Sequence, residues 1–342
     1  MKTVLITHTP TALANYFGPR AMAALEAIAA VRRNPAEEPI DTAALIAAAG
    51  DCDVIIADRR TQGHADVFSS LPRLVAFARC AVDIRNIEVE AASRAGVLVT
   101  RASAGFMASV AEWIIGMMID LSRHLSSANA AYHAGGDPPL RMGSELRGAT
   151  IGIIGYGRIG RYLGRLATAF DMRVLVSDPR VGPREPGVVP VDLQQLLSES
   201  DHVVCLANAT EATENLMNAS AFAAMKPTAY FINASRGNLV DEPALIDALD
   251  TGRIAGCALD VGRAPDQMPS PALARHPRVI ATPHIGGLTL PAIEHQALET
   301  VSQVAEILAG RIPAGAVNAD AATRLARGRR RSGGADAAPT LS

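Results

Sequence analysis

Three glycines in the segment GYGRIG have the types and spacing to hold a phosphate group. Gly155, Gly157 and Gly160 follow the apolar run ATIGII and precede a helical pattern. The first glycine permits a tight turn, the second lets the backbone approach phosphates without a Cβ in the way, and the third lets the helix pack close to the strand. The start of the following helix favours negative charge through its free N–H groups and its dipole. The segment therefore predicts a site for a dinucleotide pyrophosphate.

A carboxylate follows the glycines at the spacing along the sequence that is typical of dinucleotide-binding sites. The next apolar run, MRVLVS, ends at Asp178, which lies 18 residues beyond Gly160. A carboxylate there can accept hydrogen bonds from both hydroxyls of an adenosine ribose and would repel a 2′-phosphate, so NAD is favoured over NADP. Two alternatives stay open: Arg180 could hold a 2′-phosphate, and Asp178 with Pro179 could simply begin a turn.

Three later loops carry the residues that could do chemistry on a small acid. Arg236 follows the strand pattern AYFINA, Asp260 ends GCALD, and His284 follows VIATP. Together they offer a bidentate partner for a carboxylate, a group for the nicotinamide amide, and an acid or base that titrates near neutrality. Each residue alone also has an ordinary explanation: Arg236 could be a surface salt-bridge partner, Asp260 a helix or turn cap, and His284 a hydrogen-bonded loop histidine.

The elements that must position these residues form an α/β pattern. From residue 149 to 283, six short apolar strands alternate with helical segments, which is typical of a doubly wound parallel sheet. The first hundred residues repeat the pattern with four strands, which predicts a second α/β domain. Between them, residues 108–125 show apolar positions at helical spacing, so we expect a packing helix that serves as core or as a dimer interface.

Composition excludes several classes of protein. Apolar residues make up 49% and charged residues 19% of the 342 residues, with a formal net charge of −2, so we expect no nucleic-acid partner and no membrane partner. The N-terminus predicts a strand and not a signal peptide. The cysteines Cys52, Cys80, Cys205 and Cys257 show no metal-ligand spacing, which predicts reduced core thiols, a cytoplasmic protein and no metal site.

These motifs together resemble the D-isomer-specific 2-hydroxyacid dehydrogenases, the family that includes glyoxylate/hydroxypyruvate reductases and phosphoglycerate dehydrogenases. The resemblance lies in GYGRIG, Asp178, NASRGNLVDE, GCALDV and TPHIGG, and upstream in RCAVDIRNIEVEAASRAGVLVT and SVAEWIIGMMIDLSR. It implies two doubly wound parallel-sheet domains in a homodimer. A Rossmann cofactor domain, residues 102–290, would be inserted into a flavodoxin-like substrate domain, residues 1–101 plus 291–318, with the active site in the cleft. Residues 319–342 are expected to form a disordered tail.

The resemblance also implies roles for single residues. Arg236 would bind the substrate carboxylate and polarise its carbonyl, His284 would protonate the carbonyl oxygen, and Asp260 would hold the cofactor carboxamide. Val82 and Asp83 would stand in the loop whose backbone N–H groups meet the substrate. Besides the glycines, Asp178 and Asp260, the implied cofactor-binding residues are Arg158, Ile159, Ala207, Thr213, Ala234, Ser235 and Gly286.

Two positions depart from the family pattern. The family pairs its histidine with a glutamate, but Pro265 stands at that place. We expect Asp266 to replace the glutamate as a third catalytic residue, where a carboxylate beside the imidazole would favour its protonated form and fix its tautomer; a solvated loop aspartate is the alternative. Ala81, Val82 and Asp83 stand where the family usually has a small glycine-containing loop. The Asp83 side chain would repel a substrate anion there unless it turns away, toward Arg85 or Arg79.

The sequence therefore predicts an NAD-dependent dehydrogenase that interconverts a small 2-oxoacid and its D-2-hydroxyacid. The alternative from another class is a non-catalytic NAD(H)-binding sensor or a corepressor-like protein on the same fold. A third hypothesis is the oxidation of formate or phosphite on the same fold. No residue of the substrate loops points to these substrates.

Overall fold

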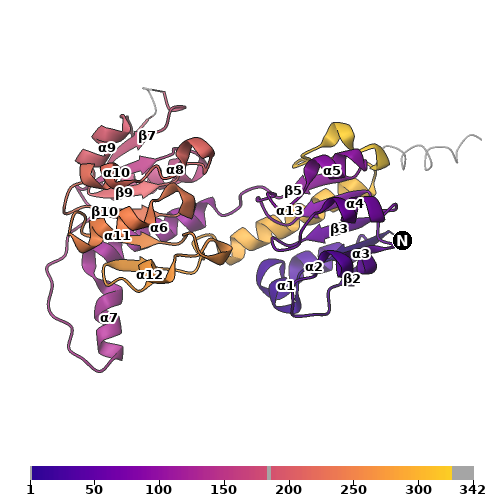
Figure 1. Ribbon diagram of the computed structural model, residues 1–342, viewed down its shortest axis with the longest axis horizontal. Coiled ribbons are helices and arrows are strands. Elements are labelled where there is room, and N and C mark those ends of the chain that lie inside the picture. Colours follow the sequence, from indigo (N-terminus) through magenta and orange to yellow (C-terminus); the bar gives the residue numbers. More distant parts are fainter. Residues whose placement is uncertain (1, 183–185, 326–342) are drawn as a thin grey trace, which may run out of the picture. The chain divides into compact units, whose positions relative to one another are not determined.

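A computed structural model describes residues 2–182 and 186–325 of the chain (Figure 1). The chain divides into two compact units, each with its own parallel sheet. Unit 1 comprises residues 1–105 and the segment that begins at Leu290, and unit 2 comprises Phe106–Thr289. The fold class is therefore α/β with two parallel sheets, as the sequence predicted.

The sheet of unit 1 has five parallel strands in the order β2-β1-β3-β4-β5. This is the flavodoxin-like order, in which the chain reverses direction across the sheet between β1 and β3. Strands β3 and β4 are buried at every position because helices cover both faces, which explains their continuous apolar runs. The strands are β1 (Thr3–Ile6), β2 (Ala30–Arg33), β3 (Val54–Ala57), β4 (Ala76–Arg79) and β5 (Leu98–Arg101).

The helices of unit 1 are short, apart from the one that returns from the end of the chain. Asp41 shows how a short helix begins, because its side chain accepts the backbone N–H of Ala44 at 2.8 Å. The helices are α1 (Pro10–Tyr16), α2 (Gly18–Glu26), α3 (Thr42–Ala49), α4 (Ala65–Ser70), α5 (Val89–Arg94) and α13 (Leu290–Leu308). Helix α13 packs on α2 and β4, so a distant segment of sequence completes this core.

The residues after α13 correct one expectation. We expected disorder from residue 319, but Ala319–Ala321 form a 3₁₀ turn and both Ala322 and Leu325 are buried in the core of unit 1. Arg324 donates from Nη1 to the carbonyl oxygen of Leu74 at 2.9 Å, which ties this segment to the domain. The low hydrophobicity of the tail masked these few contacts. The rest of the expected tail, residues 326–342, lies outside the described residues.

The sheet of unit 2 has seven parallel strands in the order β12-β11-β10-β9-β6-β7-β8. The order reverses between β6 and β9, as in a dinucleotide-binding fold. The strands are β6 (Thr150–Ile154), β7 (Arg173–Ser177), β8 (Val189–Pro190), β9 (His202–Cys205), β10 (Tyr230–Asn233), β11 (Gly256–Leu259) and β12 (Val279–Ala281). The sequence patterns indicated all of them except β8, and in unit 1 they missed only β2. Both are edge strands whose side chains are not buried.

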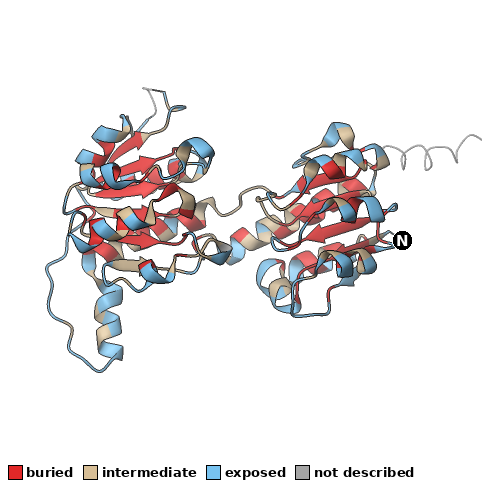
Figure 2. Ribbon diagram, viewed as in Figure 1, coloured by how far each residue is buried: buried red, intermediate tan, exposed pale blue. Residues whose placement is uncertain are grey.

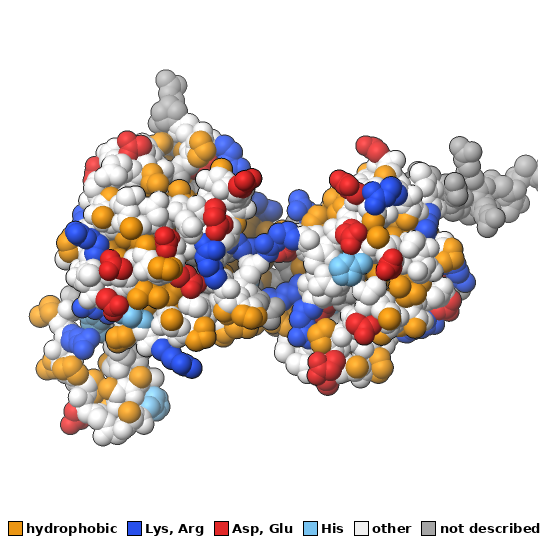
Figure 3. Space-filling view, in the orientation of Figure 1, with side chains coloured by type: hydrophobic (Ala, Val, Ile, Leu, Met, Phe, Trp, Pro, Cys, Tyr) orange, Lys and Arg blue, Asp and Glu red, His pale blue; other side chains and the backbone are white. Residues whose placement is uncertain are grey.

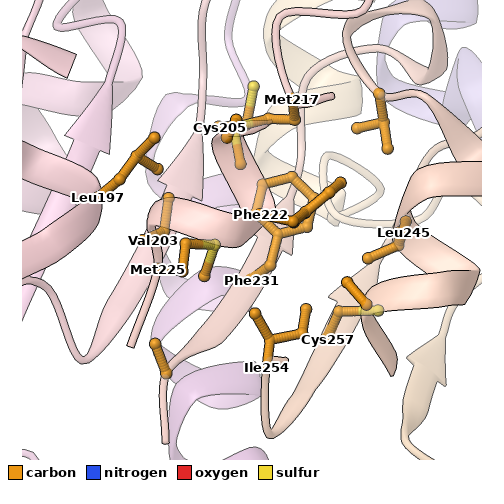
Figure 4. Packing of buried hydrophobic residues seen from close by; sticks show 14 of the residues in the cluster. Leu197, Val203, Cys205, Met217, Phe222, Met225, Phe231, Leu245, Ile254 and Cys257 are labelled. Carbon is orange, nitrogen blue, oxygen red and sulfur yellow. The ribbon is translucent and has the colours of Figure 1, made fainter. Parts of the chain in front are cut away.

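Helices cover both faces of this sheet, and Figure 2 shows the buried residues gathered on the strands between them. One face carries α6 and α8, whose apolar side chains pack on Ile151, Ile153 and Ile232. The other face carries α9, α10 and α11 around Phe222 and Phe231, whose rings meet edge to face (Figure 4). The helices are α6 (Met107–Arg123), α7 (Leu125–His133), α8 (Arg158–Ala169), α9 (Leu193–Glu199), α10 (Ala219–Ala224), α11 (Glu242–Asp250) and α12 (Pro271–Ala274).

Helix α6 is a core element. It buries Val110, Ile114, Met118 and Leu121 and ends where His124 adopts the left-handed conformation, φ 57°. No helix within residues 2–182 and 186–325 is long and apolar enough to cross a membrane.

Candidate active site

The glycine loop of unit 2 joins β6 to α8 where the strand order reverses. Gly155 has φ +92°, a conformation that L side chains rarely adopt. A Cβ built on it would lie 2.6 Å from the backbone nitrogen of Ala207, in the loop after β9. Glycine is therefore required at this position for two reasons, and the loops after β6 and β9 lie against each other.

The start of α8 is open. Gly157 is the N-cap in an extended conformation, it supplies no side-chain cap, and a Cβ on it would meet no atom within 4 Å. A Cβ on Gly160 would lie 2.7 Å from the carbonyl oxygen of Gly155, so the first turn packs closely on the loop. Arg158 and Ile159 form the rest of that turn. Uncapped N–H groups at the start of a helix of this length are an anion site.

Asp178 stands directly after β7 and is tied to the same loop. Its Oδ2 accepts the backbone N–H of Tyr156 at 2.8 Å, and its Oδ1 accepts the backbone N–H of Arg180 at 2.9 Å. Burial raises the pKa of this carboxyl, but the two N–H groups and the Arg180 guanidinium outweigh burial, so the pKa lies below its usual value. Asp178 is therefore ionised at neutral pH. Arg180 makes longer contacts to it, at 3.3 and 3.4 Å, with a side chain that is 72% exposed.

Arg236 lies in the loop after β10, whose backbone is held by hydrogen bonds from Asn233 and Ser235. Asn233, at the end of β10, donates from Nδ2 to the Arg236 carbonyl oxygen at 3.0 Å and accepts the Ser235 backbone N–H at 3.1 Å. The Ser235 hydroxyl donates to the Ala207 carbonyl oxygen at 2.6 Å. The guanidinium itself donates from Nη1 to the Ser235 carbonyl oxygen at 2.8 Å. These bonds set the direction in which Arg236 leaves the sheet.

The next residue couples this loop to its neighbour. A Cβ on Gly237 would lie 2.1 Å from the backbone of Gly262, so the loops after β10 and β11 touch through two glycines.

Asp260 organises the loop that carries His284. Its side chain accepts the Thr282 hydroxyl at 2.6 Å and the backbone N–H groups of Ile285 and Gly286 at 2.8 and 2.7 Å. Asp260 is 3% exposed. His284 lies between these contacts, half-buried, with φ 56° and its backbone N–H on the Thr282 carbonyl oxygen. The carboxylate thus holds the imidazole in place through the backbone on either side of it, in addition to any role toward a ligand.

In unit 1, the loop after β4 carries Val82 and Asp83, both half-buried. The Asp83 carboxylate receives the Arg85 guanidinium in a fork, with contacts of 2.6 and 3.0 Å, and also the Arg85 backbone N–H at 3.0 Å. Of the two partners that the sequence offered, the structure pairs Asp83 with Arg85.

The remaining predicted residues lie near the loops after β9, β10 and β12. Thr213 ends a 3₁₀ turn and donates its hydroxyl to the Asn208 carbonyl oxygen at 2.7 Å. Ala207 and Ala234 are half-buried, and Gly286 is buried beside Asp260 and the Trp113 ring. Unit 2 therefore brings the predicted cofactor residues to the carboxyl edge of one sheet.

Comparisons with known proteins show the family of the chain. The family model described as D-isomer specific 2-hydroxyacid dehydrogenase, NAD binding domain, matches residues 115–286, about half of the chain. The chain belongs to the D-isomer specific 2-hydroxyacid dehydrogenase family.

The chain is similar to a D-3-phosphoglycerate dehydrogenase of Rattus norvegicus. The two are 36% identical over 284 residues, which make up 82% of this chain and 53% of the relative. The chain spans about half the length of the curated relatives that it matches. Among solved structures, a protein of Thermus thermophilus superposes with a TM-score of 0.81 at 28% identity, covering 92% of this chain and 99% of that one. Apo D-lactate dehydrogenase of Escherichia coli gives 0.78 at 25% identity, covering 93% and 100%.

In this member of the family, the segment after β11 forms a tight turn. Gly262 donates its backbone N–H to the Gln267 carbonyl oxygen at 2.8 Å, and Ala264 donates to that of Met268 at 3.1 Å. Arg263 ties the turn down through Glu214, at 2.8 Å, and other acceptors. Pro265, at the place of the family glutamate, begins a 3₁₀ turn and is exposed. The side chain of Asp266 lies outside what the structure describes, so its catalytic role stays a prediction.

Sequence reasoning named Arg79 only as a possible partner of Asp83 and missed that it is a buried group of unit 1. Arg79 is 0% exposed and donates from Nη2 to the Thr61 carbonyl oxygen at 2.9 Å and to Asn86 Oδ1 at 2.6 Å. Burial lowers the pKa of its guanidinium to about 10, against the attraction of Asp58 and Asp83. The signal was present, because an arginine that ends a buried strand requires acceptors in the adjoining loops.

Proposed function

We propose that this protein is an NAD-dependent oxidoreductase that interconverts a small 2-oxoacid and its D-2-hydroxyacid. The observation that carries the proposal is the placement of Arg236, Asp260 and His284 on loops after the adjacent strands β10, β11 and β12, in the same sheet as the glycine loop. A guanidinium, a carboxylate and an imidazole at the carboxyl edge of such a sheet form a site for an anionic substrate beside a dinucleotide. Membership of the family supports the reaction class.

The residues present fit a nicotinamide dinucleotide. The open N-terminus of α8 suits the pyrophosphate, and Gly157 leaves room for it. The ionised Asp178 suits two ribose hydroxyls and opposes a 2′-phosphate, so we propose NAD as the preferred cofactor. When bound, the nicotinamide supplies or accepts the hydride.

The chain's own residues supply binding, orientation and a proton. The Arg236 guanidinium binds the substrate carboxylate and polarises the neighbouring carbonyl oxygen, which it can do because its loop backbone is fixed. An imidazole nitrogen of His284 gives its proton to that oxygen as the hydroxyl forms and takes it back in the reverse direction. Asp260 keeps the imidazole in position through the backbone of its loop. We propose Asp266 as the carboxylate partner of His284, in place of the family glutamate.

The test is oxidation of NADH, followed at 340 nm, against glyoxylate, hydroxypyruvate, pyruvate, longer 2-oxoacids and 2-oxodicarboxylates, with NADPH in parallel. We expect turnover with at least one acid, a preference for NADH, and loss of turnover in Arg236→Ala with NADH binding retained. Binding of NADH without turnover on any acid would favour the sensor hypothesis and would make Pro265 the first residue to examine.

We further propose that two copies associate through the projection formed by α7 and residues 134–142. Helix α7 buries none of its residues, and hydrophobic side chains stand at the surface of this projection (Figure 3). Tyr132 is 67%, Leu140 105% and Met142 97% exposed. Exposed apolar side chains of this density mark an interaction surface, and a symmetric dimer buries the same surface on both copies.

Light scattering after size exclusion tests this association. We expect a dimer for the wild type and a monomer for the double variant Leu140→Asp, Met142→Asp. Ile312→Asp, which changes an exposed apolar residue of unit 1, should leave the dimer intact. A monomeric wild type at micromolar concentration would contradict the proposal.

We propose a reducing compartment, the cytoplasm, for this protein. The four cysteine thiols are all free and buried, as is usual for proteins that fold without disulfides.

A further inference from the structure

One guanidinium ties the turn after β11 to two neighbouring loops. The Nη2 of Arg263 lies within hydrogen-bond distance of Glu214 Oε1, at 2.8 Å, and of Asn215 Oδ1, at 2.6 Å, in the segment after β9. The same nitrogen lies 3.1 Å from the carbonyl oxygens of Asn238 and Val240, and Nε donates to Val240 at 3.2 Å. Since β9, β10 and β11 are adjacent strands, Arg263 joins three loops at the carboxyl edge of one sheet.

The acceptors around Arg263 also bond one another. Asn215 donates its backbone N–H to the Asn238 carbonyl oxygen at 2.9 Å, and Asn238 donates from Nδ2 to Glu214 Oε2 at 2.8 Å. The hydrogen bonds from Arg263 and Asn238 lower the pKa of the Glu214 carboxyl, so this group is ionised at neutral pH. Arg263 therefore belongs to a network of hydrogen bonds and not to a single surface ion pair.

The segment that Arg263 holds follows directly after Arg236. Residues Gly237–Leu239 form a 3₁₀ turn, and Arg263 bonds the middle residue of this turn. A Cβ built on Gly237 would lie 2.1 Å from the backbone of Gly262, the neighbour of Arg263, so the two loops also touch through their backbones. Ahead of the turn, Asn233 donates to the Arg236 carbonyl oxygen at 3.0 Å. The backbone that bears the Arg236 side chain is thus held by Asn233 on one side and by Arg263 on the other.

We propose that Arg263 is a positioning residue for Arg236: it holds the segment after Arg236 so that the Arg236 guanidinium meets the substrate carboxylate. The inference rests on the proposed function, and all the residues that carry it lie in unit 2. Arginine suits this place because its planar guanidinium presents several N–H donors in fixed directions, whereas a lysine ammonium acts as a point charge. Without these bonds, Arg236 keeps its charge but loses its direction.

The experiment compares Arg263→Ala and Arg263→Lys with the wild type in steady-state kinetics with the best 2-oxoacid. We expect Arg263→Ala to raise KM for the acid about tenfold or more and to lower kcat, because a misplacement of about 1 Å can cost about 100-fold in rate. Arg263→Lys should raise KM about threefold, because the ammonium keeps a charge near Glu214 but cannot bond all the oxygens at once. The Kd for NADH should stay within about twofold, since the glycine loop and Asp178 follow other strands, β6 and β7.

A matched control exists in the same unit. Arg173 donates from Nη1 to Glu199 Oε2 at 2.7 Å, with side chains 50% and 34% exposed, against 38% and 42% for Arg263 and Glu214. Arg173 begins β7 and so lies at the opposite, amino edge of the sheet. Arg173→Ala should leave KM and kcat unchanged. Both alanine variants should remain folded in urea titrations, because ion pairs this exposed contribute little to stability.

An Arg263→Ala variant with the KM and kcat of the wild type would overturn the inference while the proposed function stands. An NADH affinity that falls as far as the affinity for the acid would also overturn it, because that result indicates a general loss of structure. If Arg263→Ala does not fold, Arg263→Lys decides, and a wild-type KM in that variant would overturn the inference. A wild type that turns over no 2-oxoacid would refute the proposed function, and this inference with it.

Discussion

Replacing Asp260 by asparagine tests how the His284 loop is held. The carboxylate accepts three hydrogen bonds of 2.6 to 2.8 Å from the Thr282 hydroxyl and the backbone N–H groups of Ile285 and Gly286. Asparagine has the same size but turns one acceptor into a donor. If its oxygen keeps the bonds at Oδ1, its amide nitrogen faces the buried N–H of Gly286, and neither group is satisfied.

The cost follows from these bonds. A hydrogen bond to a charged acceptor contributes about 1.5–3 kcal/mol, and a buried N–H left without a partner costs about 1–3 kcal/mol. We therefore expect Asp260→Asn to lower the free energy of unfolding of unit 2 by about 3 kcal/mol, a large part of the roughly 5–15 kcal/mol of a typical domain. Since His284 lies within this loop, kcat should fall as well.

The chain provides its own probe for this measurement. Trp113 is the one tryptophan of the sequence, and its ring lies beside Gly286: a Cβ built on that glycine would be 3.5 Å from the Trp113 Cγ. The fluorescence of Trp113 therefore reports on the loop that contains His284. Urea unfolding followed at this residue gives the stability of unit 2. Asp192→Asn is the control, because asparagine caps α9 as well as aspartate does, and should cost below about 0.5 kcal/mol. An unchanged midpoint and emission in Asp260→Asn would refute this account of the loop.

Three other predictions follow from single contacts. Gly155→Ala should weaken NADH binding at least tenfold in a fluorescence titration, because its Cβ meets the Ala207 backbone; equal affinity would contradict the close approach. Burial lowers the pKa of His202 and of His8 to about 4, so each histidine binds a proton more readily in the unfolded chain than in the folded one. The free energy of unfolding should therefore be largest above pH 6.5 and fall toward pH 4, by up to about 3 kcal/mol for each histidine. Urea titrations across that pH range measure the fall, and a free energy that does not change with pH would argue against neutral buried histidines. Arg324→Ala should lower the stability of unit 1 by about 2 kcal/mol in thermal unfolding, since the guanidinium bonds carbonyl oxygens of the domain; no shift would mean that the terminal turn contributes nothing.

The sequence predicted the elements whose residues interact with near neighbours. GYGRIG and the apolar strands gave the sheet of unit 2 because glycine spacing and continuous apolar runs are local signals. The Asp83–Arg85 pair was one of two alternatives in the sequence, since the partners stand two residues apart.

Contacts between distant segments could not be predicted in this way. The bonds from Asp260 reach residues 22 to 26 positions later, and the Arg324 bonds reach back about 250 positions. Strand β2, with half of its residues charged and exposed, carries no apolar signal and forms because β1 offers a free edge. Such contacts depend on the tertiary arrangement, which no local pattern encodes.

The most direct test of the central proposal uses NADH that carries deuterium at the transferable position of C4, together with the 2-oxoacid that gives the fastest turnover. The product is examined by chiral chromatography and mass spectrometry. The account predicts a D-2-hydroxyacid with one deuterium at C2, formed by the wild type and not by Arg236→Ala. An L-hydroxyacid, a product without deuterium at C2, or equal turnover by Arg236→Ala would contradict it.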